Sequence, residues 1–147
     1  MNKRVCSFCG HRDCDFSLKI QIKNEIMDLI KNVGVNTFYS GGMGAFDTIC
    51  ESVVREMKRT YDIKLCLVVP YFTQQLNRNK EYYTKRYDEI IVPDLGDVHY
   101  KRAIGVRNKW IAEQSDVLLC YVLRSSGGAY QMLQYARKIN KTIRKLE

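Results

Sequence analysis

The chain has 147 residues, 46% of them hydrophobic, which is enough for one domain to bury an ordinary core without disulfides or metals. Its 24 Lys and Arg residues against 16 Asp and Glu residues give a net charge of +8, which favours an anionic partner. No apolar run approaches the ~20 residues that span a bilayer, and the first residues lack a signal-peptide core. We therefore expect a cytoplasmic protein, with no membrane partner and a single domain over residues 1–147.

Apolar runs and helical spacings alternate along the chain. Strands are predicted at residues 4–8, 37–39, 64–69, 89–92, 117–121 and 142–145, with helices in the gaps. The runs at 65–69 and 117–122 are apolar throughout, which is typical of strands covered on both faces. This alternation predicts an α/β fold with a mostly parallel sheet of five or six strands between two layers of helices.

The first predicted helix follows the first strand. Ser17 or Asp15 is placed to cap its start, and Gly34 is placed to end it. Its apolar spacing comes from Ile20, Ile22, Ile26, Leu29 and Ile30. This helix is expected to cover one face of the sheet.

A glycine-rich turn, Ser40-Gly41-Gly42-Met43-Gly44-Ala45-Phe46-Asp47, joins the extended run at 35–39 to the helical run at 48–58. Glycines let backbone amides approach a ligand, and a helix that follows points its free N–H groups at the same place. We therefore expect Ser40, Gly41, Gly42 and Gly44 to contact a ligand phosphate.

Two carboxylates follow this turn. Asp47 and Glu51 are four residues apart, so both lie on one face of the emerging helix. In a functional interpretation Asp47 bonds a ribose hydroxyl or a base edge, and Glu51 is a polar contact or a proton acceptor. In the structural alternative Asp47 caps the helix and Glu51 is solvated.

A second turn, Ser125-Ser126-Gly127-Gly128-Ala129, separates the predicted strand at 116–123 from a helix at 130–138. Two such turns at the carboxyl ends of neighbouring parallel strands form one crevice, the usual ligand site of an open α/β sheet. Ser126, Gly127 and Gly128 are therefore predicted to bind the same ligand.

The segment after the first strand adds polar groups to this crevice. Gly10, His11 and Arg12 follow the strand; Arg12 is suited to holding a phosphate, and His11 to donating to it or titrating near neutrality. Zinc is the rival interpretation of the nearby Cys6, Cys9, His11 and Cys14. We expect no metal, because Cys6 lies in a strand and no second CxxC pair follows. The cysteines are expected to be reduced.

The predicted helix at 100–115 carries Arg107 and Asn108, which are placed to reach back to the ligand. Aromatic residues gather after the third strand, where they either stack on a base or pack beneath the loop: Tyr71, Phe72, Tyr82 and Tyr83.

Basic residues are scattered over many elements, which is typical of a solvated surface and makes a nucleic-acid partner the minority interpretation.

Four motifs together carry a family resemblance: Cys9-Gly10-His11-Arg12, residues 40–47, Arg107-Asn108 and Gly127-Gly128. In order and spacing the chain resembles the YpsA-like branch of the SLOG superfamily, related to DprA and to the lysine-decarboxylase-like LOG proteins. The resemblance covers nearly the whole chain. It implies a Rossmann-like three-layer sandwich that binds a nucleotide or nucleotide-derived ligand at the strand ends, with no cofactor, and it suggests a role in stress or phage-conflict signalling.

The resemblance also implies two alternatives. LOG enzymes cleave the N-glycosidic bond of nucleoside monophosphates, and here Arg107 and Glu51 would be the catalytic residues, with Asp47 as the alternative carboxylate. The second glycine turn lacks the proline and final glutamate of the LOG pattern PGGxGTxxE, however. The likeness to DprA implies single-stranded nucleic-acid binding instead. The apolar helix faces leave room for a homodimer.

Overall fold

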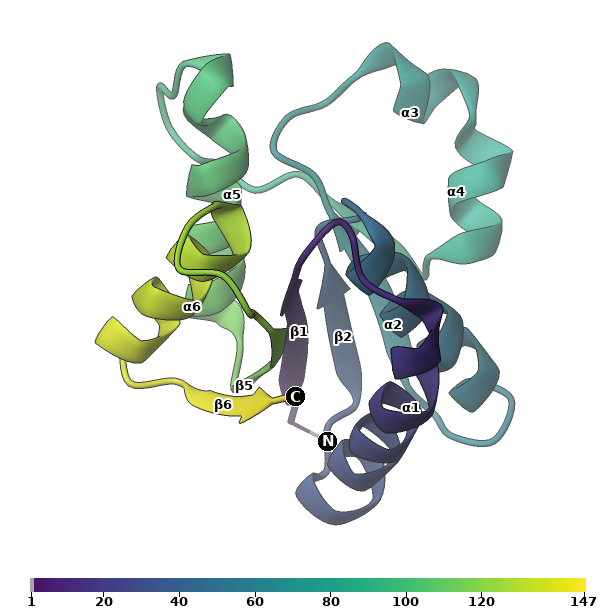
Figure 1. Ribbon diagram of the computed structural model, residues 1–147. Helices are drawn as coiled ribbons and strands as arrows, with labels where there is room; N and C mark the ends of the chain where they lie inside the picture. Colours follow the sequence, from purple (N-terminus) through teal and green to yellow (C-terminus); the bar gives the residue numbers. More distant parts are fainter. Residues whose placement is uncertain (1) are drawn as a thin grey trace.

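The computed structural model describes residues 2–147, in which six strands form one parallel sheet (Figure 1). The strands are β1 (Val5–Gly10), β2 (Thr37–Ser40), β3 (Lys64–Val68), β4 (Glu89–Ile91), β5 (Val117–Tyr121) and β6 (Thr142–Lys145). Their order across the sheet is β4-β3-β2-β1-β5-β6. The predicted α/β class and the parallel sheet are confirmed.

Helices cover both faces of this sheet (Figure 1). One face carries α1 (Lys19–Asp28) and α2 (Ala45–Met57), and the other carries α5 (Tyr100–Gln114) and α6 (Gly128–Lys138). A 3-10 turn, η1 (Phe16–Leu18), precedes α1 and a π-helical turn, η2 (Leu29–Val33), follows it. Two short helices, α3 (Gln74–Arg78) and α4 (Lys80–Arg86), arch outward between β3 and β4. The three-layer arrangement is as predicted.

Two apolar clusters form the core, one on each side of the sheet. Phe8 and Phe38 of the sheet pack with Ile22 of α1 and Val53 of α2, and every one of these side chains is buried. Leu118 packs on the opposite face with Ile111 of α5 and Leu133 of α6. Strands covered on both sides are mostly apolar along their length, which explains the unbroken apolar runs of β3 and β5.

Local signals set the ends of the first helical segment. Asp15, rather than Ser17, is the cap, and its carboxylate accepts the Ser17 N–H at 2.9 Å. Gly34 ends the segment with φ +83°, a left-handed conformation that glycine adopts without strain. Ile20 departs from the predicted apolar face, because its side chain is 74% exposed.

Other boundaries differ from the predicted ones. β1 continues to Gly10 because Cys9 and Gly10 pair with Cys120 and Tyr121 of β5. The helices α2 and α6 begin at Ala45 and Gly128 instead of residues 48 and 130. Both glycine turns are therefore shorter than predicted, and the helix ends lie closer to the sheet.

The strand order reverses beside β1, because β2 adjoins it on one side and β5 on the other. Connections after β1 and β5 then leave on opposite faces, which opens a crevice at the carboxyl edge of these strands.

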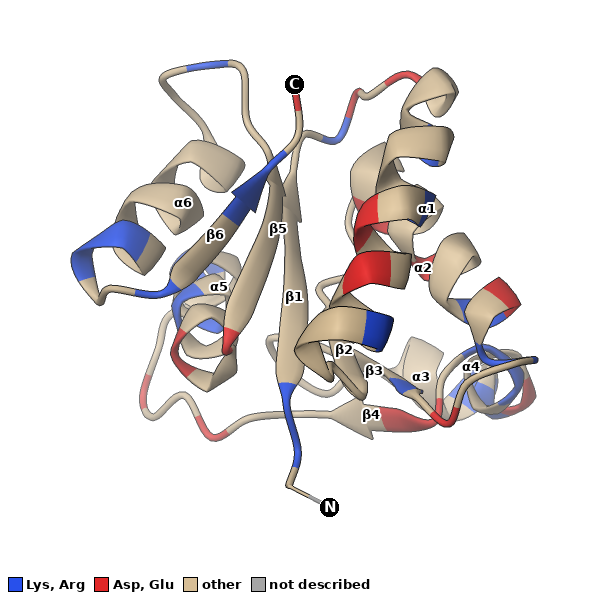
Figure 2. Cartoon of the chain, turned by 90° about the horizontal axis from the view of Figure 1, so that it is seen from below, with Lys and Arg blue, Asp and Glu red and all other residues tan. Residues whose placement is uncertain are grey.

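Figure 2 shows Lys and Arg residues distributed over several elements, including α6 and β6, rather than gathered on one. None of the described helices is long and apolar enough to cross a membrane.

Candidate functional site

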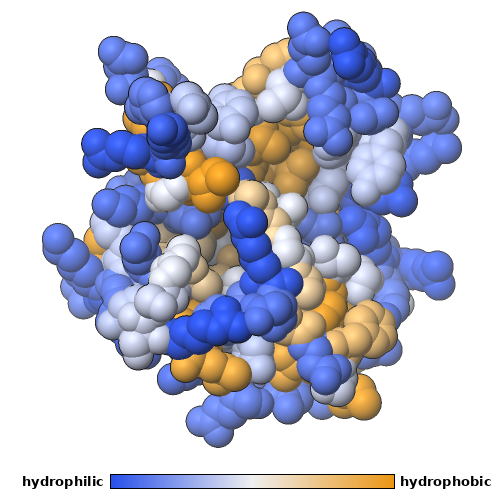
Figure 3. All heavy atoms as spheres, turned by 45° about the horizontal axis from the view of Figure 1, so that its top comes forward, coloured by the Kyte–Doolittle hydropathy of each residue, from blue (hydrophilic) through white to orange (hydrophobic). Residues whose placement is uncertain are grey.

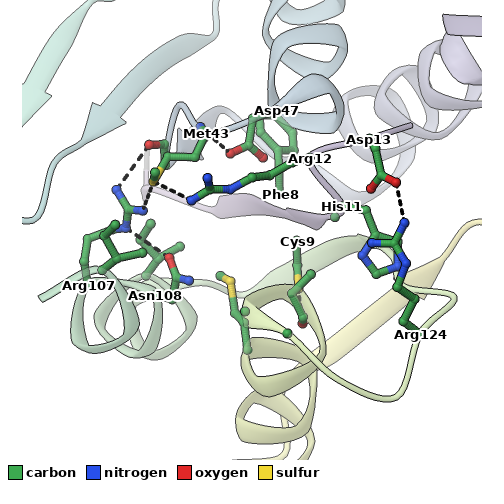
Figure 4. Close-up of a pocket in the computed structure, with 18 of the residues that line it drawn as sticks. Phe8, Cys9, His11, Arg12, Asp13, Met43, Asp47, Arg107, Asn108 and Arg124 are labelled. Atoms are coloured by element: carbon green, nitrogen blue, oxygen red, sulfur yellow. Dashed lines mark hydrogen bonds and ion pairs between the residues drawn. The ribbon is translucent and has the colours of Figure 1, made fainter. Parts of the chain in front are cut away.

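A cavity of about 370 Å³ lies at the carboxyl edge of β1 and β5 (Figure 4). The predicted site residues that line it are Gly10, His11, Arg12, Gly41, Asp47, Arg107, Asn108, Ser126, Gly127 and Gly128. Ser40, Gly42, Gly44 and Glu51 do not line this cavity. The fold thus unites the segments after β1, β2 and β5 with α5, as the crevice prediction requires.

Arg107 on α5 is the most deeply placed charge of the site, with an exposed fraction of 2%. One terminal nitrogen, Nη1, donates to the carbonyl oxygens of Gly41 at 3.1 Å and Val68 at 2.9 Å. Its Nε donates to Asn108 Oδ1 at 3.0 Å. Burial lowers the pKa of Arg107 from its ordinary value. This arginine therefore fixes the ends of β2 and β3 while its charge faces the cavity.

Met43 lies between two arginines (Figure 4). Its sulfur is 3.3 Å from Arg107 Nη2 and 3.9 Å from Arg12 Nη2. A thioether is a weak acceptor, so neither guanidinium finds a strong partner there. Two positive groups therefore converge on a position that an anionic oxygen would satisfy better.

Asp47 is the buried carboxylate of the cavity, 8% exposed. Its Oδ2 accepts the Met43 N–H at 3.0 Å, so it braces the glycine turn, and the N-cap position itself is held by Gly44. Burial raises the pKa of Asp47 to about 7, with Glu51 adding to the rise and the Met43 amide opposing it. Near neutrality this carboxyl therefore titrates, and it can hold or release a proton at the cavity wall.

Glu51 is not solvated, because its exposed fraction is only 5%. Its Oε2 accepts from Ser40 Oγ at 2.5 Å, and its Oε1 accepts from Arg55 Nη2 at 3.1 Å and from the Tyr87 hydroxyl at 2.7 Å. Ser40 Oγ in turn accepts the Gly42 N–H at 3.0 Å. Ser40 and Glu51 thus form a support behind the glycine turn.

The first glycine turn is largely occupied by the protein itself. The Ala45 amide at the start of α2 donates to the Arg12 carbonyl at 2.8 Å, and the Phe46 amide donates to the His11 carbonyl at 3.4 Å. A Cβ at Gly44 would lie 2.4 Å from Arg12 Cα, so glycine is required for this close contact. The N–H groups at the start of α2 therefore bind the segment after β1. Some of the donors that were predicted to contact a phosphate at this turn are already used inside the protein.

The second glycine turn is open. Gly127 is the N-cap of α6, has φ +93° and gives the helix no side-chain cap. A Cβ at Gly127 or at Gly128 would meet no atom within 4 Å. The first N–H groups of a helix have no partner inside it, and the dipole adds partial positive charge there. This helix start, which lines the cavity, is suited to receiving an anion.

His11 links the two sides of the cavity. Its Nε2 accepts the Leu123 N–H at 2.8 Å, which places the proton of the neutral ring on Nδ1. Burial lowers the pKa of His11 below its ordinary value of 6.5, and Arg124 adds to the effect. At neutral pH His11 is therefore uncharged: its Nε2 holds the segment after β5, and its Nδ1–H is the donor that it can offer to a ligand.

This arrangement predicts an acid-sensitive contact. Because the folded-state pKa is depressed, the contribution of His11 to stability is present above pH 6.5 and is lost as the pH falls through that pKa. We expect an NMR titration to give a His11 pKa below 6.5, with a smaller protection factor for exchange of the Leu123 amide as the ring protonates. The Leu118 amide inside β5 is the internal control. A His11 pKa at or above 6.5 would contradict this assignment.

The segments around His11 do not build a metal site. Cys6 and Cys9 point to opposite faces of the sheet, because they belong to different core clusters. Within residues 2–147 no three His, Cys, Asp or Glu side chains are placed to hold a metal ion, and all six cysteines are free thiols.

Sequence reasoning missed two charged residues at the rim. Arg124 forms an ion pair with Asp13, which joins the segments after β5 and β1 (Figure 4). Both line the cavity. Each follows a strand that ends at this edge, and that position was the available signal.

The fold and the cavity place the chain among α/β proteins with a crevice at the carboxyl edge of a parallel sheet. The family model of YpsA, described as the YspA SLOG family, matches residues 6–145. The chain therefore belongs to this SLOG family, and the predicted superfamily is confirmed. No curated protein matches the chain.

Solved structures with the same fold include DNA processing protein A (DprA) from two bacteria. The protein from Streptococcus pneumoniae has a TM-score of 0.71 at 14% identity, over 99% of this chain and 50% of that one. The protein from Helicobacter pylori, described for its single-stranded DNA binding mode, has a TM-score of 0.69 at 18% identity, over 98% of this chain and 65% of that one. The chain thus spans less than two thirds of either relative.

The Moco carrier protein of Chlamydomonas also shares the fold. Its TM-score is 0.57 at 17% identity, over 99% of this chain and 77% of that one.

Proposed function

We propose that this chain binds or senses a nucleotide or nucleotide-derived ligand in the cavity at the carboxyl edge of β1 and β5. One observation carries the proposal: the uncapped start of α6, with open backbone at Gly127 and Gly128, shares a cavity with Arg12 and Arg107. A phosphate group matches this combination of free amides and guanidinium groups. The cavity volume of about 370 Å³ is also in the range of small-molecule sites.

Other residues have supporting roles in the proposal. Asp47 contacts a sugar hydroxyl or a base edge, and Asn108 and Ser126 are polar contacts on either side. Gly10 and Gly41 line the wall, and Gly42, Gly44, Ser40 and Glu51 support the glycine turn behind it. The likeness to DprA concerns the fold, and the family membership supports a nucleotide-type ligand, with a sensing role in stress or phage-conflict signalling as the finer proposal.

A matched pair of substitutions at Gly128 tests the phosphate site. Gly128→Ala adds a methyl group that meets no protein atom, so it should leave stability nearly unchanged and is the uncharged reference for nucleotide binding. Gly128→Asp places a carboxylate at the first position of α6, where it stabilises the helix but repels phosphate. We expect calorimetric titration with nucleoside mono- and diphosphates to show at least about tenfold weaker binding for Gly128→Asp than for Gly128→Ala, because a like charge beside the phosphate opposes its binding. Equal affinities for the two variants would contradict the site.

The same samples separate the alternatives. Free base in the titrated mixtures would indicate cleavage of the N-glycosidic bond, and Asp47, whose pKa is about 7, would be the general acid of that reaction. Glu51 would act only through Asp47 and the turn, since its oxygens already accept from Ser40, Arg55 and Tyr87. Retention of a single-stranded oligonucleotide that weakens steeply with salt and ignores Gly128→Asp would indicate nucleic-acid binding instead.

A further inference from the structure

A second cavity, of about 310 Å³, adjoins the first on the side of α3 and α4. Four tyrosines line it together with apolar residues of β3 and α3: Tyr71, Tyr82, Tyr83, Tyr87, Leu67 and Leu76. Figure 3 shows a hollow with a hydrophobic floor on this upper side of the molecule. The cavity offers aromatic faces of the kind on which a base stacks.

None of the four tyrosines of this second cavity is fully buried, although Tyr87 packs against the core and donates its hydroxyl to Glu51. Neither α3 nor α4 has a buried residue, and Tyr71 is 45% exposed. Tyr82 and Tyr83 meet edge to face with ring centroids 5.2 Å apart, and Arg86 lies 3.8 Å over the Tyr82 ring. Packing beneath the loop therefore does not account for Tyr71 and Tyr82, which stay 45% and 50% exposed. Aromatic rings kept at a cavity outside the core are available to a ligand.

The two cavities share one wall. Gly41, Met43, Ile104 and Arg107 line both of them. The side chains in this wall include the Met43 thioether, which lies against Arg107 at 3.3 Å and near Arg12 at 3.9 Å. An unbranched side chain with weak polar contacts can move aside at low cost. A ligand can therefore extend from one cavity to the other along Arg107.

The positive charge of Arg107 indicates the charge of the ligand group that passes along this shared wall. Its described acceptors are two backbone carbonyls, the Asn108 amide oxygen and the Met43 sulfur, and none of them is charged. Asp47 acts on Arg107 electrostatically but makes no hydrogen bond to it. A buried cation with no hydrogen-bonded anion is costly, and an anion placed against it lowers that cost. The crossing group is therefore expected to be anionic.

These observations deepen the function proposed above and rest on it. We propose that the ligand carries two aromatic rings joined by a phosphate bridge, as in a dinucleotide. The bridge lies between Arg12 and Arg107 in place of the Met43 sulfur and extends toward the start of α6. One nucleoside occupies the first cavity, and the second ring stacks among the tyrosines of the second cavity.

Calorimetric titration of the full chain with three probes tests this proposal: AMP, ADP and diadenosine diphosphate, with the guanosine, cytidine and uridine sets beside them. Diadenosine diphosphate carries less negative charge than ADP, so tighter binding of it cannot come from charge. We expect the dinucleoside of the preferred base to bind at least about tenfold more tightly than the matching nucleoside diphosphate, because a second ring is stacked.

A blocking variant locates the second ring. Thr73 lines only the second of the two cavities, and its side chain makes no cap hydrogen bond, so Thr73→Trp fills the space without breaking a contact. This variant should lose the dinucleoside advantage and keep the mononucleotide affinity. Thr60→Trp, on an exposed turn after α2 that lines neither cavity, is the matched control and should keep both.

The outcomes separate the two proposals. A dinucleoside that binds no more tightly than the nucleoside diphosphate, or an advantage that survives Thr73→Trp, would overturn the two-ring ligand and leave the mononucleotide site standing. Failure of every nucleotide to bind would overturn both.

Discussion

Arg107→Ala is expected to lower the free energy of unfolding by about 2–4 kcal/mol, because it leaves two carbonyls without their donor. These carbonyls, of Gly41 and Val68, end β2 and β3 at the wall of the cavity. The same substitution should weaken nucleotide binding about 10- to 150-fold, the loss of a charged hydrogen bond. Urea denaturation and calorimetric titration measure the two effects separately.

Arg102→Ala is the matched control for this prediction. Arg102 lies on the same helix, but it is exposed and lines no part of the first cavity. Its removal should change stability by less than about 0.5 kcal/mol. Arg107→Lys keeps the charge but lacks the planar guanidinium group. It should recover part of the nucleotide binding and little of the stability that comes from the hydrogen bonds to the Gly41 and Val68 carbonyls. A fully stable Arg107→Ala protein that binds nucleotides normally would refute both roles.

Asp47→Asn should stabilise the protein above neutral pH by up to about 4 kcal/mol. The pKa of Asp47 is raised by burial from 3.8 to about 7, so the folded state holds a proton between these values that the unfolded state has released. The contribution of the protonated carboxyl is therefore complete below pH 3.8 and is lost as the pH rises through about 7. Asn is isosteric and can still accept the Met43 N–H, but it does not titrate.

Urea unfolding of both proteins between pH 5 and pH 8 measures this effect. The difference in stability between variant and parent should grow with pH and level off above the pKa of Asp47. Asp62→Asn, an exposed site away from the cavity, is the control and should give a flat difference. A flat difference for Asp47→Asn as well would mean that this carboxyl is ionised throughout.

Much of the fold follows from local patterns. The unbroken apolar runs predicted β3 and β5, and the cap at Asp15 and the stop at Gly34 lie where residue type placed them. These features depend on neighbours a few residues away, so sequence contains them. Helix starts were predicted less well, because α2 follows a glycine N-cap and α6 begins in glycine, which has no propensity signal for a helix.

The two glycine turns show the limit of such patterns. They are alike in sequence, yet the start of α2 is filled by carbonyls of His11 and Arg12, while the start of α6 is open. Only the packing of the segment after β1 against α2 distinguishes them. Similarly, Glu51 is buried because the Tyr87 hydroxyl, from a distant element, completes its hydrogen bonds.

The sequence by itself determined the parallel α/β fold, the family and the edge of the sheet where the site lies, because apolar periodicity and strand-to-helix turns act over short distances. Only the tertiary structure decided which amides stay free, which carboxylate titrates near pH 7 and that Arg107 is buried between two cavities. A buried polar group finds its hydrogen-bond partner in a segment that is distant along the chain. A local sequence pattern therefore cannot predict which two segments come into contact.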